Sequence, residues 1–320
     1  MRLRAFFASL ILSLPIVWGL NVATGTESNL AFLGNIASPK FLSANISADF
    51  GMEKKELIRK DNAADLELGA RAAISIFIGP DKKEKVLFGK NIQEKLPIAS
   101  ITKLMTADVF LENFDLNQPI TISQEAAMQD GGAVFAPGEK FLAKDLLYAG
   151  LIESSNSASY ALAEVASVNG FVALMNLQAQ YLGMKNTYFG NPTGLDPDYP
   201  SEIINLSTAE DLVRLAIHLF DKPLIWEILN TPEFYLYADD GSVHHKAMTT
   251  DDFLKSDSLV KLSDIIVGGK TGYTPQAGEC LMLVLRNKNG GFIVNVILGS
   301  EDRFGEMKEM IGWVKNSYQW

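Results

Sequence analysis

The amino-acid sequence predicts an α+β protein in which a mainly antiparallel sheet is flanked by helices and packs beside a helical lobe. Three observations lead to this prediction. Strand patterns occur near residue 75 and again after residue 265, helical patterns fill most of the segment between them, and a helical stripe follows the last strand. The two ends of the chain would therefore build the sheet, and the middle would build the lobe.

The first two strands are predicted on either side of a turn at Pro80-Asp81. Residues 72–78 alternate apolar with small side chains and are rich in β-branched residues, and residues 85–88 follow the turn. Proline presets φ for a turn, and aspartate bonds to nearby backbone N–H groups. We therefore expect a β-hairpin here.

Helical patterns dominate residues 97–254. Their clearest start signal is Ser207-Thr-Ala-Glu210, which has the form of a capping box. Leu212, Leu215 and Leu219 follow at spacings that place them on one helical face. We expect a helix that Ser207 caps.

Strands return near the end of the chain, at residues 265–274, 281–285 and 292–298. Asn289-Gly290, between the last two, is a strong hairpin signal because both residues adopt positive φ readily. Apolar residues then recur three and four positions apart and predict a closing helix that covers the sheet: Phe304, Met307, Ile311, Val314 and Tyr318.

The first residues are typical of an exported protein. Arg2 and Arg4 form a basic start, and residues 5–20 are mostly apolar. We expect residues 1–25 to be a signal peptide or an N-terminal membrane anchor, residues 26–68 a spacer, and residues 69–320 one folded domain. This order predicts an extracytoplasmic protein, either secreted or attached to the membrane through its N-terminal segment.

Charge and composition exclude several classes of function. The net charge is −10, so the chain lacks the basic surface that a nucleic-acid-binding protein needs. Cys280 is the only cysteine, which excludes an internal disulfide and a cysteine-based zinc site. His218, His244 and His245 do not follow the H-E-x-x-H spacing, and we expect no metal and no cofactor.

Ser100-Ile-Thr-Lys103 is the candidate for a nucleophile with its base. Positions three apart on a helix face the same way, so Lys103 would lie beside Ser100 on the first helical turn. Lysine accepts a proton near neutral pH only if burial or a nearby cation lowers its pKa. The spacing alone is weak, because Ser258 and Lys261 repeat it only a few residues before the lysine at position 270.

Two further elements make the pattern specific. Ser154 and Asn156 place a hydroxyl and an amide two residues apart, where they could relay a proton and hold a substrate amide. Lys270-Thr271-Gly272 lies in a predicted strand and offers a cation and a hydroxyl to a carboxylate, while its glycine permits close backbone approach. Each element alone also fits an ordinary helix cap or strand end. Their order along the chain is the combination found in penicillin-binding proteins and class A β-lactamases.

With these elements, residues 70–318 resemble the serine D-Ala-D-Ala carboxypeptidases, the low-molecular-weight penicillin-binding proteins of the S11 type. The surrounding stretches that match are residues 96–107, 145–152, 191–195 and 268–274. The resemblance implies the penicillin-binding protein/β-lactamase-like transpeptidase fold and makes residues 69–320 the catalytic domain. It also implies peptidoglycan stem peptides as substrates and β-lactam antibiotics as covalent inhibitors.

The resemblance assigns the reacting groups residue by residue. Ser100 would attack the carbonyl between the two terminal D-alanines, and Lys103 would accept the serine proton. Ser154 would assist proton transfer to the leaving amine, and Asn156 would orient the acylated peptide. Water would then hydrolyse the acyl-enzyme.

The same resemblance assigns substrate binding to the third element. Lys270 and Thr271 would bind the terminal carboxylate. The backbone N–H of Tyr273, which follows Gly272, would form the oxyanion hole together with the N–H of the nucleophile. Arg303 could add a second positive charge for the carboxylate, and a solvated surface arginine is the alternative.

Some alternatives stay open. A D,D-endopeptidase that cuts cross-links would use the same residues, and a non-catalytic peptidoglycan-binding relative would keep the same fold. A class A β-lactamase is disfavoured, because its E-x-x-L-N loop is absent and Glu202-Ile-Ile-Asn-Leu206 has the last two letters exchanged. Glu153 stands where many relatives are apolar, and we expect it to perturb the titration of the nearby lysines. We expect no further domain after the closing helix, and residues 5–22 are the expected site of any membrane attachment.

Overall fold

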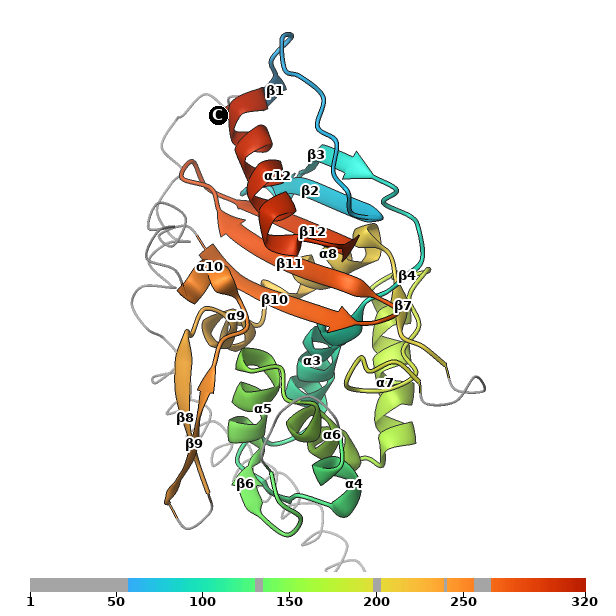
Figure 1. Cartoon of the computed structure of the whole chain (residues 1–320), viewed down its shortest axis with the longest axis vertical. Helices are drawn as coiled ribbons and strands as arrows, with labels where there is room; N and C mark the ends of the chain where they lie inside the picture. Colours follow the sequence, from blue (N-terminus) through green and yellow to red (C-terminus); the bar gives the residue numbers. More distant parts are fainter. Residues whose placement is uncertain (1–56, 130–134, 198–202, 239–240, 256–265) are drawn as a thin grey trace, which may run out of the picture. The chain divides into compact units, whose positions relative to one another are not determined.

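The structure is a computed structural model, and it describes residues 57–129, 135–197, 203–238, 241–255 and 266–320 (Figure 1). The predicted signal peptide or anchor, most of the predicted spacer, and the repeated spacing at Ser258 and Lys261 lie outside the described residues.

A five-stranded sheet in the order β10-β11-β12-β2-β3 forms the centre of the folded unit (Figure 1). Every neighbouring pair is antiparallel, and β12 pairs with β2 to join the two ends of the chain. The strands are β2 (Ala72–Ile78), β3 (Glu84–Lys90), β10 (Ile266–Thr274), β11 (Gly278–Arg286) and β12 (Phe292–Ser300). This confirms the predicted α+β class and the sheet built from both ends.

Helices cover both faces of the sheet (Figure 1). On one face, α12 (Arg303–Ser317) buries Met307 and Met310 in a cluster with Leu283 of β11. On the other face, α8 (Ala209–Leu219) packs against β2 and β12. The sheet is therefore a buried platform, and its edge strand β10 is itself mostly buried.

The helical lobe lies beside the β10 edge (Figure 1). Its elements are α3 (Lys103–Asn113), α4 (Gln124–Ala127), α5 (Ala143–Ile152), α6 (Asn156–Glu164), α7 (Val168–Tyr181) and α9 (Pro223–Leu229). Among the described residues, no single helix is long and apolar enough to cross a membrane. The helices α6 and α7 reach that length and apolar composition only when they are counted together, and the chain bends sharply between them.

Pairs of short strands also form outside the central sheet. They are β4 (Leu96–Pro97) with β7 (Leu206–Ser207), β5 (Pro119–Thr121) with β6 (Lys140–Leu142), and β8 (Glu233–Tyr237) with β9 (Val243–Met248). The β8–β9 hairpin is followed by the short helix α10 (Asp252–Lys255), which leads toward β10.

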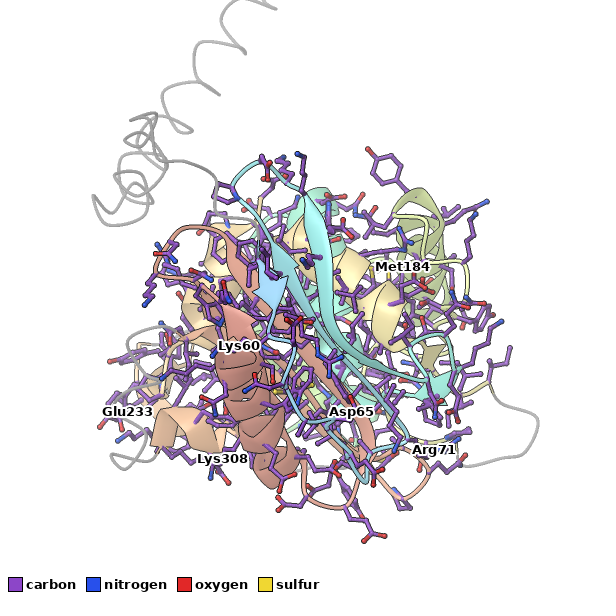
Figure 2. All side chains as sticks on the ribbon, turned by 90° about the horizontal axis from the view of Figure 1, so that it is seen from above. Lys60, Asp65, Arg71, Met184, Glu233 and Lys308 are labelled. Carbon is purple, nitrogen blue, oxygen red and sulfur yellow. The ribbon has the colours of Figure 1, made fainter. Side chains whose placement is uncertain are left out.

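The folded unit begins at Leu57, before the residue 69 that the sequence analysis predicted. β1 (Ile58–Arg59) pairs with β13 (Tyr318–Gln319), so Tyr318 belongs to a strand and not to the closing helix. Lys60 lies against the end of α12, where its Nζ donates to the Asn316 carbonyl at 2.7 Å (Figure 2). Residues 57–68 were not recognised because their apolar residues recur with neither the period of a strand nor that of a helix.

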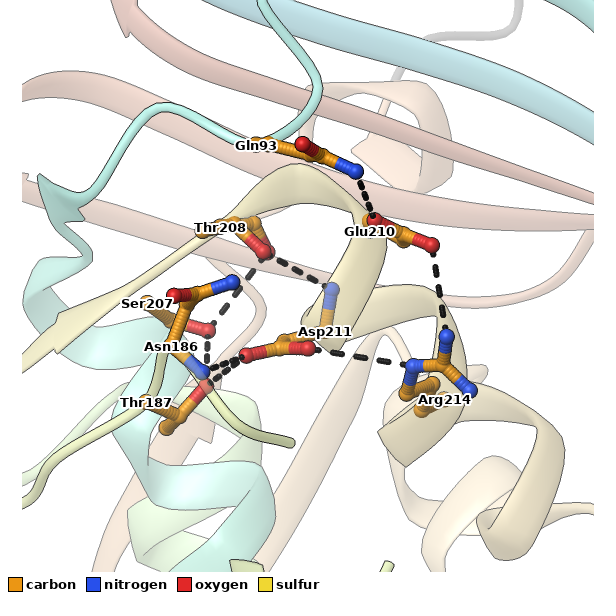
Figure 3. A network of polar contacts seen from close by, with 8 residues as sticks. All are labelled: Gln93, Asn186, Thr187, Ser207, Thr208, Glu210, Asp211 and Arg214. Atoms are coloured by element: carbon orange, nitrogen blue, oxygen red, sulfur yellow. Dashed lines mark hydrogen bonds and ion pairs between the residues drawn. The ribbon is translucent and has the colours of Figure 1, made fainter. Parts of the chain in front are cut away.

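The cap of α8 lies one residue later than predicted (Figure 3). Thr208, not Ser207, is the N-cap, and its hydroxyl accepts from the Asp211 N–H at 3.0 Å. Ser207 instead belongs to β7, and its hydroxyl bonds to Thr187 Oγ1 at 2.7 Å. The Asp211 carboxylate accepts from the Asn186 N–H at 2.8 Å, so the first turn of α8 also fixes the chain that follows α7.

Candidate active site

Ser100 and Lys103 meet across a 3₁₀ turn. The turn η1 (Ala99–Thr102) carries Ser100, and Lys103 is the first residue of α3. Ser100 Oγ and Lys103 Nζ are 2.8 Å apart. Side chains three apart eclipse one another in a 3₁₀ helix, which brings the pair closer than the predicted α-helical turn would.

The Lys103 amine is buried, with only 1% of the residue exposed. Its Nζ lies 2.6 Å from Asn156 Oδ1 and 2.7 Å from the Thr193 carbonyl oxygen. Burial and then the positive charge of Lys270 hold the pKa of Lys103 well below its ordinary value. A neutral amine donates two N–H bonds and keeps one lone pair, so these two oxygens leave the lone pair for the Ser100 hydroxyl.

Ser154 and Lys270 form the second polar pair of the site. Lys270 Nζ donates to Ser154 Oγ at 2.9 Å and to the Thr271 carbonyl at 3.0 Å. Lys270 is also 1% exposed. Burial and the nearby Arg303 lower its pKa to about 7, while Asp251 opposes this shift.

Ser154 has a left-handed backbone, with φ of +65°. This conformation costs a non-glycine residue about 1–2 kcal/mol, and it persists only where the surroundings determine it. It separates α5 from α6, whose first residue is Asn156. The bend places Ser154 toward Lys270 and Asn156 toward Lys103.

Gly272 lets strand β10 approach the nucleophile. A Cβ atom at this position would lie 2.9 Å from the backbone nitrogen of Ser100 and 3.1 Å from the carbonyl oxygen of Ile98. Only glycine fits without moving η1. Tyr273 follows on the same edge strand, with 63% of the residue exposed. The predicted residues of all three elements therefore surround one point.

The family of D-alanyl-D-alanine carboxypeptidases matches this chain over residues 60–302. The chain belongs to this family. The match includes all three elements of the site, and it confirms the predicted family.

Curated relatives of the family carry two different activity names. The chain is 32% identical over 271 residues to the D-alanyl-D-alanine carboxypeptidase DacF of Bacillus subtilis strain 168, covering 82% of this chain and 66% of DacF. It is 33% identical over 254 residues to a D-alanyl-D-alanine endopeptidase of Pseudomonas aeruginosa, covering 76% of this chain and 77% of that protein. Slightly less than two thirds of DacF is thus spanned.

Solved structures confirm the predicted fold. Penicillin-binding protein D2 of Listeria monocytogenes in its cefotaxime-bound form superposes with a TM-score of 0.65 at 27% identity, covering 78% of this chain and 99% of that one. A D-alanyl-D-alanine carboxypeptidase of Mycobacterium tuberculosis H37Rv gives a TM-score of 0.69 at 24% identity, over 80% and 95%. The architecture is that of penicillin-binding proteins.

Within this family site, the Thr193 carbonyl was not foreseen as a partner of Lys103. Residues 191–195 matched the family, but a backbone oxygen has no sequence signal of its own. Asn191 Oδ1 holds the loop by accepting from the Gly194 N–H at 2.7 Å. Gly194 has φ of +86°, and a Cβ there would lie 1.9 Å from the carbonyl oxygen of Ala99, so the loop packs directly on the nucleophile turn.

Arg303 and residues 250–251 complete the surroundings of Lys270. Arg303 Nη1 donates to the Gly272 carbonyl at 3.0 Å, so this arginine belongs to the site and is not a solvated surface residue. Thr250 Oγ1 lies 2.5 Å from Thr271 Oγ1. Burial raises the pKa of the Asp251 carboxyl to about 6. Thr250 and Asp251 were not predicted, because no motif accompanies them.

Glu153 does not act on the lysines as expected. Both of its carboxylate oxygens lie 3.0 Å from His245 Nε2. Burial raises the pKa of Glu153, and His245 is the main opposing influence. The expectation was wrong, because the Glu153 carboxylate pairs with His245 of the β8–β9 hairpin and is not among the groups that shift the pKa of Lys103 or Lys270.

One cluster outside the site gathers side chains of the kinds that bind metals. His218 Nε2 lies 3.0 Å from Asp108 Oδ1 and 3.5 Å from Glu112 Oε1. Lys222 Nζ lies 2.8 Å from the same Glu112 oxygen, and Gln178 donates to Asp108 at 2.8 Å. Lys222 already pairs with one of the two carboxylates, and the cluster ties α3 to α8.

Replacing Cys280 with serine is expected to leave acylation of Ser100 unchanged. Cys280 is fully buried in β11, and burial raises the pKa of its thiol to about 11, so a thiolate nucleophile is not formed at neutral pH. The rate of labelling by a fluorescent penicillin measures this. Loss of labelling in Cys280→Ser at an unchanged melting temperature would contradict the assignment of Ser100 as the nucleophile.

Proposed function

We propose that this chain removes the terminal D-alanine from peptidoglycan stem pentapeptides through an acyl-serine intermediate. The observation that supports this best is the 2.8 Å contact between Ser100 Oγ and a buried Lys103 amine whose pKa is held low. A nucleophile with a base in hydrogen-bond reach is the arrangement that acyl transfer requires.

In the acylation step, Ser100 Oγ bonds to the carbonyl carbon of the penultimate D-alanine. Lys103 accepts the hydroxyl proton, and the C–N bond to the terminal D-alanine breaks. The leaving amine needs a proton, which the Ser154 hydroxyl can deliver while Lys270 replaces it through their 2.9 Å contact. The products are free D-alanine and the acyl-enzyme.

In the deacylation step, water attacks the ester carbon of the acyl-enzyme. Before this step, the proton that Lys103 took from Ser100 has to replace the one that Lys270 gave up through Ser154, which restores both lysines. The neutral Lys103 then accepts a proton from that water. The ester C–O bond then breaks and Ser100 recovers its hydrogen. Asn156, which contacts Lys103 at 2.6 Å, is placed to hold the acylated peptide beside this base.

Substrate selection is assigned to strand β10. Lys270 and Thr271 would bind the terminal carboxylate, with Arg303, which contacts the Gly272 carbonyl, adding positive charge. The backbone N–H groups of Ser100 and Tyr273 would stabilise the oxyanion, a contribution of about 3 kcal/mol for each donor. Penicillins would acylate Ser100 in the same way and serve as covalent inhibitors.

Cleavage of peptidoglycan cross-links is the second candidate activity. Endopeptidase names occur among the relatives, in Pseudomonas aeruginosa at 33% identity and in Escherichia coli K12 at 30% identity. The same nucleophile and base would serve, and the difference would lie in how a second peptide is accommodated.

The basic and apolar start of the chain supports action outside the cytoplasm, with residues 1–25 as leader or anchor.

The two activities are separated by their products. Incubation with a stem pentapeptide is expected to release free D-alanine, which a D-amino-acid oxidase assay measures, and Ser100→Ala is the inactive control. A cross-linked dimer is supplied in parallel and its fragments are separated by mass. Fragments from the dimer without free D-alanine would replace the carboxypeptidase proposal by the endopeptidase. Absence of both products and of a penicillin adduct would indicate a non-catalytic relative.

A further inference from the structure

The segment that leaves β9 connects the second element of the site to the third. The Thr250 N–H donates to the Ile152 carbonyl at the end of α5 at 3.2 Å. Its hydroxyl lies 2.5 Å from that of Thr271 on β10. Five residues earlier, His245 contacts Glu153, the residue before Ser154. This one segment thus contacts both the last residue of α5 and the residue that follows it.

The Glu153–His245 contact is sheltered and paired twice. The side chains are 16% and 22% exposed, and both carboxylate oxygens lie 3.0 Å from His245 Nε2. Lys246, the next residue on β9, points outward and pairs with Glu233 instead. His245 is therefore the residue of this strand that contacts Glu153, next to Ser154.

A chain of polar contacts continues behind the pair. His245 Nδ1 lies 2.7 Å from His244 Nδ1, and His244 Nε2 lies 3.3 Å from Glu139 Oε1. The Phe135 ring stacks on His244 with its centroid 5.4 Å away. The groups that face the two imidazoles are thus two carboxylates, each imidazole itself, and aromatic rings.

We propose that Glu153 and His245 are positioning residues for the acylation of Ser100. Ser154 is a non-glycine residue with φ of +65°, and its hydroxyl has to meet Lys270 at 2.9 Å. His245 fixes the side chain of Glu153 on one side, and Lys270 holds Ser154 on the other. Without the contact between His245 and Glu153, the last turn of α5 can relax. The Ser154 hydroxyl then moves away from Lys270. This proposal rests on the proposed acyl-serine function.

The test is a double-mutant cycle on the acylation rate constant, measured with a fluorescent penicillin. Glu153→Ala and His245→Ala are each expected to slow acylation about tenfold to a hundredfold, because small misplacements near a reacting centre have effects of that size. The double variant is expected to be no slower than the slower single variant, since both remove one contact. His245→Gln is expected to recover most of the rate, because its amide N–H can reach the Glu153 carboxylate.

Controls separate positioning from folding. Lys246→Ala removes an exposed side chain from the same strand and is expected to acylate at the wild-type rate, and melting temperatures are compared for every variant. With D-alanine release as a second readout, kcat is expected to fall more than KM rises. Additive effects, no rescue by His245→Gln, or single variants that acylate at the wild-type rate would each overturn the proposal. Absence of labelling in the wild type would instead overturn the proposed function.

Discussion

Replacing Lys103 with methionine is expected to slow acylation of Ser100 by about a hundredfold to ten-thousandfold, the usual contribution of a general base. Methionine has similar length but no nitrogen, so nothing would accept the Ser100 proton at the 2.8 Å contact. The Asn156 and Thr193 oxygens would also lose their shared donor. The measurement is the rate of covalent labelling by a fluorescent penicillin, followed by mass.

Lys103→Arg distinguishes the base from a merely positive residue. Arginine keeps its proton at every accessible pH, so it cannot accept one from serine. We expect this variant to be as slow as Lys103→Met, although it restores a cation. Lys246→Met, on the exposed face of β9, is the matched control and should label normally. Labelling of Lys103→Arg at the wild-type rate would mean that charge and not proton transfer activates Ser100.

The sequence predicted the sheet and the three elements of the site because their signals are local. Alternating strands and the hairpin at Asn289-Gly290 are read over a few residues, and the structure confirms the pairing of β11 with β12. The distance between Ser100 and Lys103 also follows from their spacing. The structure differs from the prediction only in the kind of turn that brings the two residues together, which is 3₁₀ and not α-helical.

The parts that were missed depend on contacts between distant residues or on backbone atoms. The Thr193 carbonyl oxygen contacts Lys103 across 90 residues of sequence, and no residue type signals such a backbone contact. His245 contacts Glu153 across 92 residues of sequence. The sequence alone therefore could not show that Glu153 pairs with His245 and does not act on the lysines. The N-cap Thr208 was missed for a different reason. Two adjacent hydroxyl residues both fit a capping box, and pairing of Ser207 in β7 decides between them.

The two buried lysines need opposite protonation states. Lys270 is the neighbouring cation that lowers the pKa of Lys103, after burial itself. Lys103 has to be neutral to accept a proton, whereas Lys270 has to be charged to bind a carboxylate. Activity is therefore expected only at a pH where Lys103 is neutral and Lys270 is still charged, and Arg303 and Asp251 act on the pKa of Lys270 in opposite directions.

Lys270 predicts the alkaline limit of the reaction. Its pKa in the free protein is about 7, so its positive charge is present below that pH and is lost as the pH rises through it. We expect kcat/KM for D-alanine release to fall above neutral pH, because this ratio reports the free enzyme. A bound carboxylate stabilises the ammonium and raises its pKa, so kcat is expected to fall only at a higher pH. A peptide ending in D-alanine amide lacks the carboxylate and should show no such separation.

Lys270→Ala tests the coupling itself, with penicillin acylation as the readout. Removing the neighbouring cation lets the pKa of Lys103 rise, so Lys103 stays protonated to higher pH and the acid limb of the acylation profile moves toward alkaline pH. Loss of a buried charge that binds a carboxylate is also expected to lower kcat/KM for the peptide about a hundredfold or more. If Lys270→Ala lost peptide turnover but acylated with the wild-type rate and pH profile, Lys270 would only bind substrate. Burial would then be sufficient to keep the Lys103 amine neutral.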